Sequence, residues 1–310
     1  MDRFEAMSTL LAAVEAGSLS AASRKLGMPL ATVSRKVSEL EAHLKTRLVT
    51  RASRRLTLTE TGRAYVAACK RILEELEEAE RDASGEYRAP RGDLTVTAPI
   101  VFGRLHVLPV VAEFLSSYPD IDVRLVLADR TLNLLEEQID VAVRIGALPD
   151  SSLIATRVGA VRRIVCASPA YLATRGAPQN PADLAALDCV TFEGLSSPTS
   201  WTFRADNAEP SVRIHSRLAV TTAEAAVDAA IAGIGVTRVL CYQAADAVRA
   251  GSLLIVLQDF EPMPWPVSLI YRGQALLPLK VRAFLDFAAP RLKARLAQNA
   301  EYVQPMKDEL

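Results

Sequence analysis

Apolar side chains recur every three or four positions through the first forty residues of the chain, which is the spacing of amphipathic helices. The pattern predicts one helix at 3–16 and a second, shorter helix at 19–26, with a turn at Gly27. A third helix follows, and its apolar stripe consists of Val33, Val37 and Leu40. Two short helices around a glycine turn are typical of a helix-turn-helix motif. Here the motif comprises the second and third predicted helices, and the third would lie in the DNA major groove.

The opposite face of this third helix is polar and carries Thr32, Ser34, Arg35 and Lys36. Arginine can bind guanine through two hydrogen bonds, and serine or threonine can bond to bases or phosphates. These residue types on one face therefore predict contact with base edges.

Two short runs of alternating polarity, at 48–50 and 56–58, flank a basic turn and predict a β-hairpin. A hairpin at this distance after a helix-turn-helix is typical of a wing. Its arginines would lie along phosphates or enter the minor groove, and they are Arg51, Arg54 and Arg55.

A long amphipathic helix is predicted next, because Thr59 can cap a helix that begins near Glu60. Its apolar positions step alternately by four and three residues, and they are Tyr65, Cys69, Ile72, Leu76, Ala79 and Ala83. This heptad seam indicates a coiled coil with a second copy of the chain. The alternative is a helix that packs on its own domain. Residues 84–92 have the composition of a hinge-like linker.

From residue 93 onwards, apolar strands alternate with helices, which predicts an α/β domain with a mainly parallel sheet and helical crossovers. The predicted strands are 94–98, 123–128, 141–144, 164–167, 189–192, 236–239 and 267–271. The predicted helices are 102–118, 134–138, one after Pro169, 222–232 and 280–296. Pro109 either kinks the first of these helices or marks its late start.

Charge is unevenly distributed, although the formal net charge is zero. Residues 1–71 hold 13 Lys and Arg against 6 Asp and Glu, whereas residues 72–90 hold 2 against 7. A basic head on a near-neutral body is the footprint expected for nucleic-acid contact, although a solvated basic face gives the same count. Acids interrupt the N-terminal segment, so we expect no signal peptide. No stretch approaches the ~18 apolar residues of a membrane span, so none is expected. Four cysteines without a CxxC pair fit a reduced, cytoplasmic protein.

The segments SLSAASRKLG at 18–27 and ATVSRKVSELE at 31–41, with 48–51 and 56–62, closely resemble the LysR-type transcriptional regulators. In that family the residues placed like Leu30, Ala31, Ser34 and Arg35 face bases. Many members have Gln or a second Pro where this chain has Leu30 and Ala31, so readout here is expected to include apolar contacts with thymine methyls. The candidate DNA-contacting residues are Ser20, Leu30, Ala31, Thr32, Ser34, Arg35, Lys36, Arg51, Arg54 and Arg55.

The C-terminal part resembles the two-lobed regulatory domain of the same family, which is akin to solute-binding proteins. The matching segments are 99–103, 118–119, 139–146, 168–172 and 232–236. The resemblance implies a homodimer or homotetramer, paired through the long helix. The expected domains are 1–60 for DNA binding, 61–92 for the linker helix and hinge, and 93–310 for effector binding, with lobe I about 93–162 and 267–297 and lobe II about 163–266.

Ligands of open α/β sheets bind beyond the carboxyl ends of the strands. Helices that start near Ile100 and Thr222 would direct unpaired N–H groups there, which favours an anion, and Arg130 and Arg144 are nearby cations. We therefore expect a small organic acid as effector. Some family members have Ser at the Pro99 position, so this chain lacks that hydroxyl. The candidate effector-binding residues are Pro99, Ile100, Val101, Arg130, Arg144, Gly146, Thr221 and Thr222.

Other chemistries find little support in the residues. The glycines at 233 and 235 lack the third glycine of a dinucleotide loop and precede a strand, which is the wrong order. The three histidines show no metal spacing, and no catalytic motif is present, so neither a cofactor nor enzymatic activity is expected. A redox pair of Cys166 and Cys189 is an open alternative. Two other functions stay open: an architectural DNA-binding protein or repressor without an effector, and a solute-binding protein.

Overall fold

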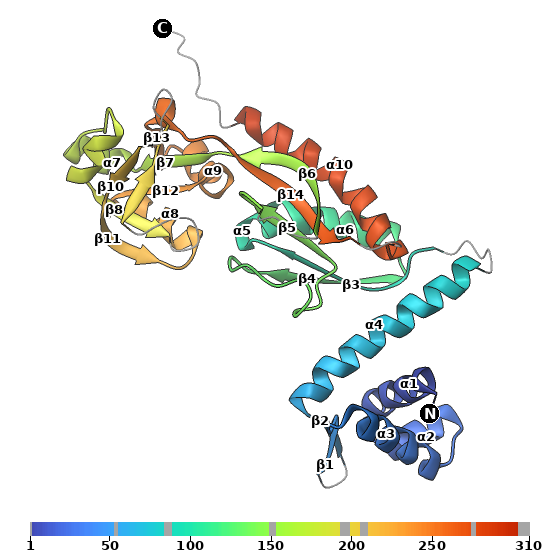
Figure 1. Ribbon diagram of the computed structural model, residues 1–310. Coiled ribbons are helices and arrows are strands. Elements are labelled where there is room, and N and C mark those ends of the chain that lie inside the picture. The colour runs from blue at the N-terminus through green and yellow to red at the C-terminus, as the bar shows by residue number, and fades with distance from the viewer. Residues whose placement is uncertain are drawn as a thin grey trace. The chain divides into compact units, whose positions relative to one another are not determined.

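Each of the units Met1–Arg88 and Ala89–Leu310 has its own clusters of buried residues, two in the first unit and three in the second among the described residues. The structure, a computed structural model, describes residues 2–52, 55–83, 89–148, 153–192, 199–204, 210–273 and 277–302 (Figure 1).

The first unit is a bundle of three helices followed by a hairpin and a long helix, as the sequence predicts. Asp2 and Ser18 cap the first two helices through their side chains, and Gly27 ends the second at a φ of 64°. Thr59 caps the long helix, since its Oγ1 accepts from the Gly62 N–H at 2.9 Å. The elements are α1 (Arg3–Glu15), α2 (Leu19–Leu26), α3 (Leu30–Leu44), β1 (Val49–Ala52), β2 (Arg55–Leu58) and α4 (Glu60–Ala83).

The second unit contains two five-stranded sheets, each of which is mixed rather than mainly parallel. In the first sheet β4, β3 and β5 are parallel, while β14 and β6 are antiparallel to their neighbours. Its strands are β3 (Gly92–Ala98), β4 (Ile121–Leu127), β5 (Val141–Ile145), β6 (Leu153–Val161) and β14 (Trp265–Arg272). We refer to this sheet and its helices as lobe I.

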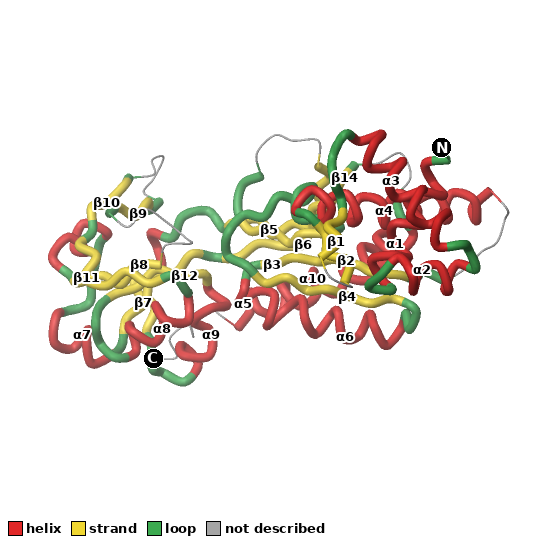
Figure 2. Tube along the Cα trace, turned by 90° about the horizontal axis from the view of Figure 1, so that it is seen from below, coloured by secondary structure: helices red, strands yellow, loops and turns green. Residues whose placement is uncertain are grey.

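The second sheet has the order β11-β8-β12-β7-β13, and we refer to it and its helices as lobe II. Its strands are β7 (Arg163–Ala167), β8 (Asp188–Phe192), β11 (His215–Val220), β12 (Val236–Leu240) and β13 (Leu254–Val256). A separate hairpin, β9 (Ser200–Thr202) and β10 (Ser211–Arg213), lies on one side of this sheet (Figure 2). The helices on the other side are α8 (Ala223–Ile231) and α9 (Cys241–Arg249), and α7 (Pro169–Arg175) follows β7.

The first helical segment of lobe I runs from residue 100 to 117 without a break. It comprises α5 (Ile100–Phe102), a π turn at Gly103–Val107 (η1) and α6 (Leu108–Ser117). Pro109 therefore does not mark a late start, since the helix already begins at Ile100, and the π turn at Gly103–Val107 directly precedes the turn that contains it. By length and composition this segment could cross a membrane, contrary to our expectation that no stretch would, but 44% of it is buried inside the protein. Phe102, Val110 and Phe114 belong to the lobe I core.

The structure differs from the sequence-based elements at several points. Residues 134–138 form a turn rather than a helix, because Gln138 adopts a left-handed φ of 54° and the segment closes after one turn. Five strands were not predicted: β6, β9, β10, β11 and β13. The predicted linker at 84–92 lies outside the described residues at 84–88, and Gly92 already belongs to β3. The last helix, α10 (Leu279–Tyr302), covers the predicted 280–296.

Candidate DNA-binding and effector-binding sites

The third helix is amphipathic in the predicted sense. Val33, Val37 and Leu40 are completely buried in the N-terminal unit. Burial of this stripe leaves the opposite face of α3 exposed. The first two residues of the helix, Leu30 and Ala31, are both exposed. Of the other candidates, Ser20 on α2 is exposed, and Thr32 and Ser34 are half-buried.

Arg35 is the most accessible cation on this face. Its Nη1 lies 3.1 Å from Glu39 Oε1 on the next turn, and 66% of its side chain is exposed. An exposed pair of this kind contributes about 0–1 kcal/mol, so Arg35 can exchange Glu39 for DNA at little cost.

Lys36 does not belong to the predicted DNA face. Its ammonium forms an ion pair with Glu5 of α1, and only 14% of its side chain is exposed. The prediction for Lys36 is corrected: the side chain joins α3 to α1. The sequence pattern missed this because Glu5 is thirty-one positions away and no periodicity links the two helices.

The wing pairs as an antiparallel hairpin, with Arg51 opposite Leu56 and Ala52 opposite Arg55. Arg54 and the side chains of Arg51 and Arg55 lie outside the described residues. The sequence pattern missed the residue that attaches this wing to the helices. Glu41 Oε1 of α3 accepts the N–H groups of Leu48 and Val49 at 2.8 and 3.0 Å, so one carboxylate orients the start of β1 relative to α3.

The two halves of the α4 heptad seam have different surroundings. Tyr65 packs against the core of the N-terminal unit and Cys69 is completely buried, because this half of α4 lies on α1 and β2. For these two positions the alternative interpretation, packing on the helix's own domain, is correct. Ile72 is 37% exposed and Leu76 is half-buried, while the side chains of Ala79 and Ala83 lie outside the described residues.

In lobe I the helix N-terminus that was predicted to bind an anionic ligand already binds a carboxylate of the protein itself. The Ile100 N–H donates to Asp129 Oδ1 at 3.0 Å, so the prediction of an unpaired donor at this position is wrong. Burial, followed by the smaller effect of Glu224, raises the pKa of Asp129, while its bond from Ile100 lowers it. Val101 is only 3% exposed and packs in the core, whereas Pro99 and Ile100 are half-buried.

The two predicted cations of lobe I are engaged by the protein itself. Arg130 forms an ion pair with Glu137 at 2.9 Å, with 69% of the arginine side chain exposed. Arg144 Nη2 donates to the Leu132 carbonyl at 2.6 Å, and burial lowers its pKa. The Arg144 guanidinium is thus held by the Leu132 carbonyl, whereas the exposed Arg130 pair contributes only about 0–1 kcal/mol and leaves Arg130 accessible to a ligand.

The remaining predicted effector residues occupy strand ends and turns. Thr222 caps α8 through its side chain, which accepts from the Ala225 N–H at 3.3 Å, while Thr221 is exposed. Gly146 follows β5 at a φ of 106°, and a Cβ there would lie 3.8 Å from the Trp265 ring. The lobes contact each other near the first helix start, where the rings of Phe102 and Tyr242 are 5.3 Å apart.

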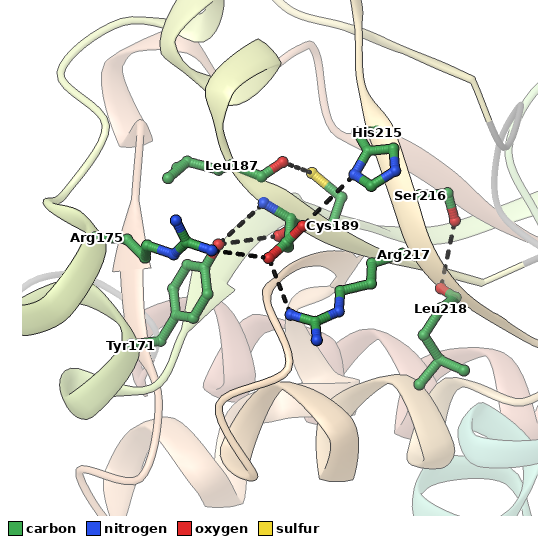
Figure 3. Close-up of polar contacts among 9 residues, drawn as sticks. Tyr171, Arg175, Leu187, Cys189, His215, Ser216, Arg217 and Leu218 are labelled. Atoms are coloured by element: carbon green, nitrogen blue, oxygen red, sulfur yellow. Dashed lines mark hydrogen bonds and ion pairs between the residues drawn. The ribbon is translucent and has the colours of Figure 1, made fainter.

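The glycines at 233 and 235 serve the fold of lobe II. Gly233 has a φ of 77° in the turn after α8, and a Cβ on Gly235 would lie 2.3 Å from the Asp188 carbonyl oxygen. The side chain of Asp188 accepts from Arg175 at 3.3 Å and Arg217 at 3.1 Å, which links α7, β8 and β11 (Figure 3). Among the described residues, no group of three or more His, Cys, Asp or Glu could hold a metal ion.

Cys166 and Cys189 are too far apart to form a redox pair, so that alternative is wrong. They lie on β7 and β8, which flank β12, so their strands are about 9.6 Å apart, beyond the reach of a disulfide of roughly 7 Å between Cα atoms. Their side chains also join different cores on opposite faces of the sheet. Cys189 Sγ donates only to the Leu187 carbonyl (Figure 3).

Both thiols are expected to be unreactive in the folded protein. Burial raises the pKa of each to about 12, since the thiolate is disfavoured away from water, and the thiolate is the reactive form. Iodoacetamide at pH 8, followed by peptide mass spectrometry, should leave both unmodified in the native chain and alkylate both in urea. Rapid alkylation of native Cys166 or Cys189 would contradict this burial.

Comparison with known proteins connects these two units to one family. The family described as "Bacterial regulatory helix-turn-helix protein, lysR family" matches residues 4–63, and "LysR substrate binding domain" matches residues 88–293. An HTH-type transcriptional repressor of Pseudomonas aeruginosa is 36% identical over 289 residues, covering 93% of this chain and 91% of the relative.

Two full-length structures show the same architecture. CrgA, a LysR-type transcriptional regulator from Neisseria meningitidis, has a TM-score of 0.59 at 31% identity and covers 93% of this chain and 98% of its own. AphB, a virulence activator of Vibrio cholerae, has a TM-score of 0.57 at 28% identity, with coverages of 92% and 97%. The chain therefore belongs to the LysR-type transcriptional regulators, with a helix-turn-helix DNA-binding domain, a long linker helix and a two-lobed α/β effector-binding domain.

Proposed function

We propose that this regulator binds a two-fold symmetric duplex operator through α3 and the wing of two protomers, and that a small organic acid between the two lobes modulates this binding. The observation that carries the proposal is the exposed start of α3, where no side chain caps the first N–H groups. Free N–H groups at a helix start favour phosphate, which would place the neighbouring Leu30, Ala31 and Arg35 at base edges. Because its target is bacterial DNA, the protein acts in the cytoplasm.

Residues 1–60 form the DNA-binding part in this proposal, 61–92 the linker and 93–310 the effector-binding part. The exposure of Ile72 and the partial exposure of Leu76 support pairing of two protomers through the second half of α4, which would present two α3 helices to successive major grooves. Leu30 and Ala31, which are exposed, favour operator positions that carry thymine methyls.

The change Arg35→Ala is expected to weaken operator binding by about 1–3 kcal/mol and to relax base preference at the contacted position. The reason is that Arg35 loses only a weak exposed pair with Glu39 when it binds DNA. Fluorescence anisotropy with operator and scrambled duplexes at fixed salt measures both effects.

The matched comparison is Arg54→Ala in the wing. A phosphate contact should weaken binding to every sequence alike and reduce the salt dependence by about one counterion. Wild-type affinity and base preference in Arg35→Ala would show that α3 does not read the operator.

Modulation by an effector separates this proposal from an architectural protein, which would bind DNA and ignore small molecules. Candidate contacts at the strand ends are Pro99, Ile100, Gly146, Thr221 and Thr222. Operator binding by the full chain, measured with and without a panel of organic acids, tests this part. A change with at least one acid supports it, and DNA binding that no metabolite alters favours the architectural alternative.

A further inference from the structure

Lobe II contains a buried cation with few partners. Arg238 on β12 is 5% exposed, and its Nη1 donates to the Thr202 carbonyl at 3.1 Å. Its Nε has no hydrogen-bond acceptor, and within the described ranges no carboxylate forms an ion pair with it. Burial, with a smaller effect of Arg163, lowers its pKa to about 9, so the group is still charged at neutral pH. A buried charge without a counterion is costly, and a bound anion would offset that cost.

A second donor without an acceptor lies beside it. Trp201 on β9 is 1% exposed, and its indole Nε1 has no hydrogen-bond acceptor among the described residues. The Arg238 guanidinium carbon lies 5.1 Å from the Trp201 ring centroid. An indole nitrogen can only donate, and so can a guanidinium. A ligand that satisfies both must supply acceptors, and one that balances the charge must be an anion.

The same surface continues towards lobe I. Arg238 lies opposite Val165, and Leu240 lies opposite Arg163, so the two arginines project from the same face of adjacent strands. The Arg163 guanidinium carbon stands 4.4 Å from the centroid of the Trp265 ring, which faces Gly146 at the end of β5. Two cations and two indoles thus form a continuous row that ends at a predicted effector residue.

We propose that Arg238 and the indole N–H of Trp201 bind the carboxylate of the effector, with Arg163 adding a second positive charge. This assignment rests on the proposed function, because it names the chemical class of the effector and the groups that hold it. It places the carboxylate in lobe II, on buried donors that have no acceptor, rather than on Arg130 and Arg144 of lobe I, each of which has a partner in the protein. A carboxylate offers two acceptor oxygens and one negative charge, which matches the donors and the charge at this position.

Thermal unfolding of the full chain at constant ionic strength tests the assignment. The probes are acetate, butanoate and phenylacetate, each beside its neutral amide, with inorganic phosphate as a further anion. The variants are Arg238→Met, which removes the guanidinium, and the control Arg217→Met, whose arginine is 58% exposed and pairs with Asp188. Carboxylates should raise Tm of the wild type and of Arg217→Met in a concentration-dependent way, and their amides should not. Arg238→Met should lose the shift, while its Tm without carboxylate should be no lower than that of the wild type.

Three outcomes would overturn the assignment. They are the absence of any carboxylate shift in the wild type, an equal shift in Arg238→Met, or a shift with phosphate alone. A marked loss of Tm in Arg238→Met without carboxylate would also overturn it, since the arginine would then have its partners within the protein. Operator binding by the same proteins distinguishes failure of this binding site from failure of the proposed function. If acids alter DNA binding in Arg238→Met as in the wild type, effector regulation stands and only this site fails.

Discussion

A Leu76→Asp variant is expected to sediment as a smaller species than the parent protein. Leu76 is the half-buried member of the α4 seam that follows Ile72. Among the described residues it is not part of the N-terminal core cluster against which Tyr65 packs. In a paired α4 the new carboxylate would be buried without a counterion, at a cost of about 3–5 kcal/mol for each charge. Each 1.4 kcal/mol is about a tenfold change in the dissociation constant, so the dimer should weaken by at least a hundredfold.

The control introduces the same side chain away from the seam, as Ala64→Asp at an exposed position of the same helix. Ala64→Asp should keep the parent oligomer, and Leu76→Asp should also lose affinity for a two-site operator while keeping weak binding to a half-site. Sedimentation velocity across a range of concentrations gives both oligomeric states. An unchanged assembly in Leu76→Asp would place the protomer contact elsewhere.

The second large effect is expected for Gly62→Ala at the start of α4. A Cβ at Gly62 would lie 1.9 Å from the Leu48 carbonyl oxygen, which also accepts from the Thr59 N–H at 3.0 Å. Neither backbone segment can shift without losing a hydrogen bond. The Leu48 N–H donates to Glu41, and the Gly62 N–H donates to the Thr59 side chain that caps the helix. Overpacking costs about 1–3 kcal/mol, and a clash between two backbones belongs at or above the upper end of that range.

Chemical denaturation of the full chain, monitored by circular dichroism, measures this loss. Operator binding should fall as well, since the displaced carbonyl belongs to the residue that precedes the wing. Thr61→Ala is the neighbouring control: the side chain is exposed and its change should alter stability by less than about 0.5 kcal/mol. Wild-type stability in Gly62→Ala would show that α4 and the wing can separate without cost.

Much of the N-terminal unit follows from local sequence. The apolar spacing of Val33, Val37 and Leu40 defines the buried face of α3 whatever surrounds it, because a helix places every third or fourth residue on one side. Ser18 and Thr59 mark helix starts because a hydroxyl can satisfy N–H groups only two or three residues away. Such short-range rules also locate most strands of the regulatory domain.

Only the tertiary structure decided which of these residues are available to DNA or a ligand. Lys36 forms an ion pair with Glu5, and Asp129 accepts a hydrogen bond from the Ile100 N–H. In each case the two residues are far apart in the sequence. Arg238 appears in the sequence as one charged residue inside the apolar run of a central strand, a signal that marks a buried cation without naming its surroundings. Its neighbours come from β7 and β9, and strand pairing across such distances depends on the whole sheet rather than on local spacing.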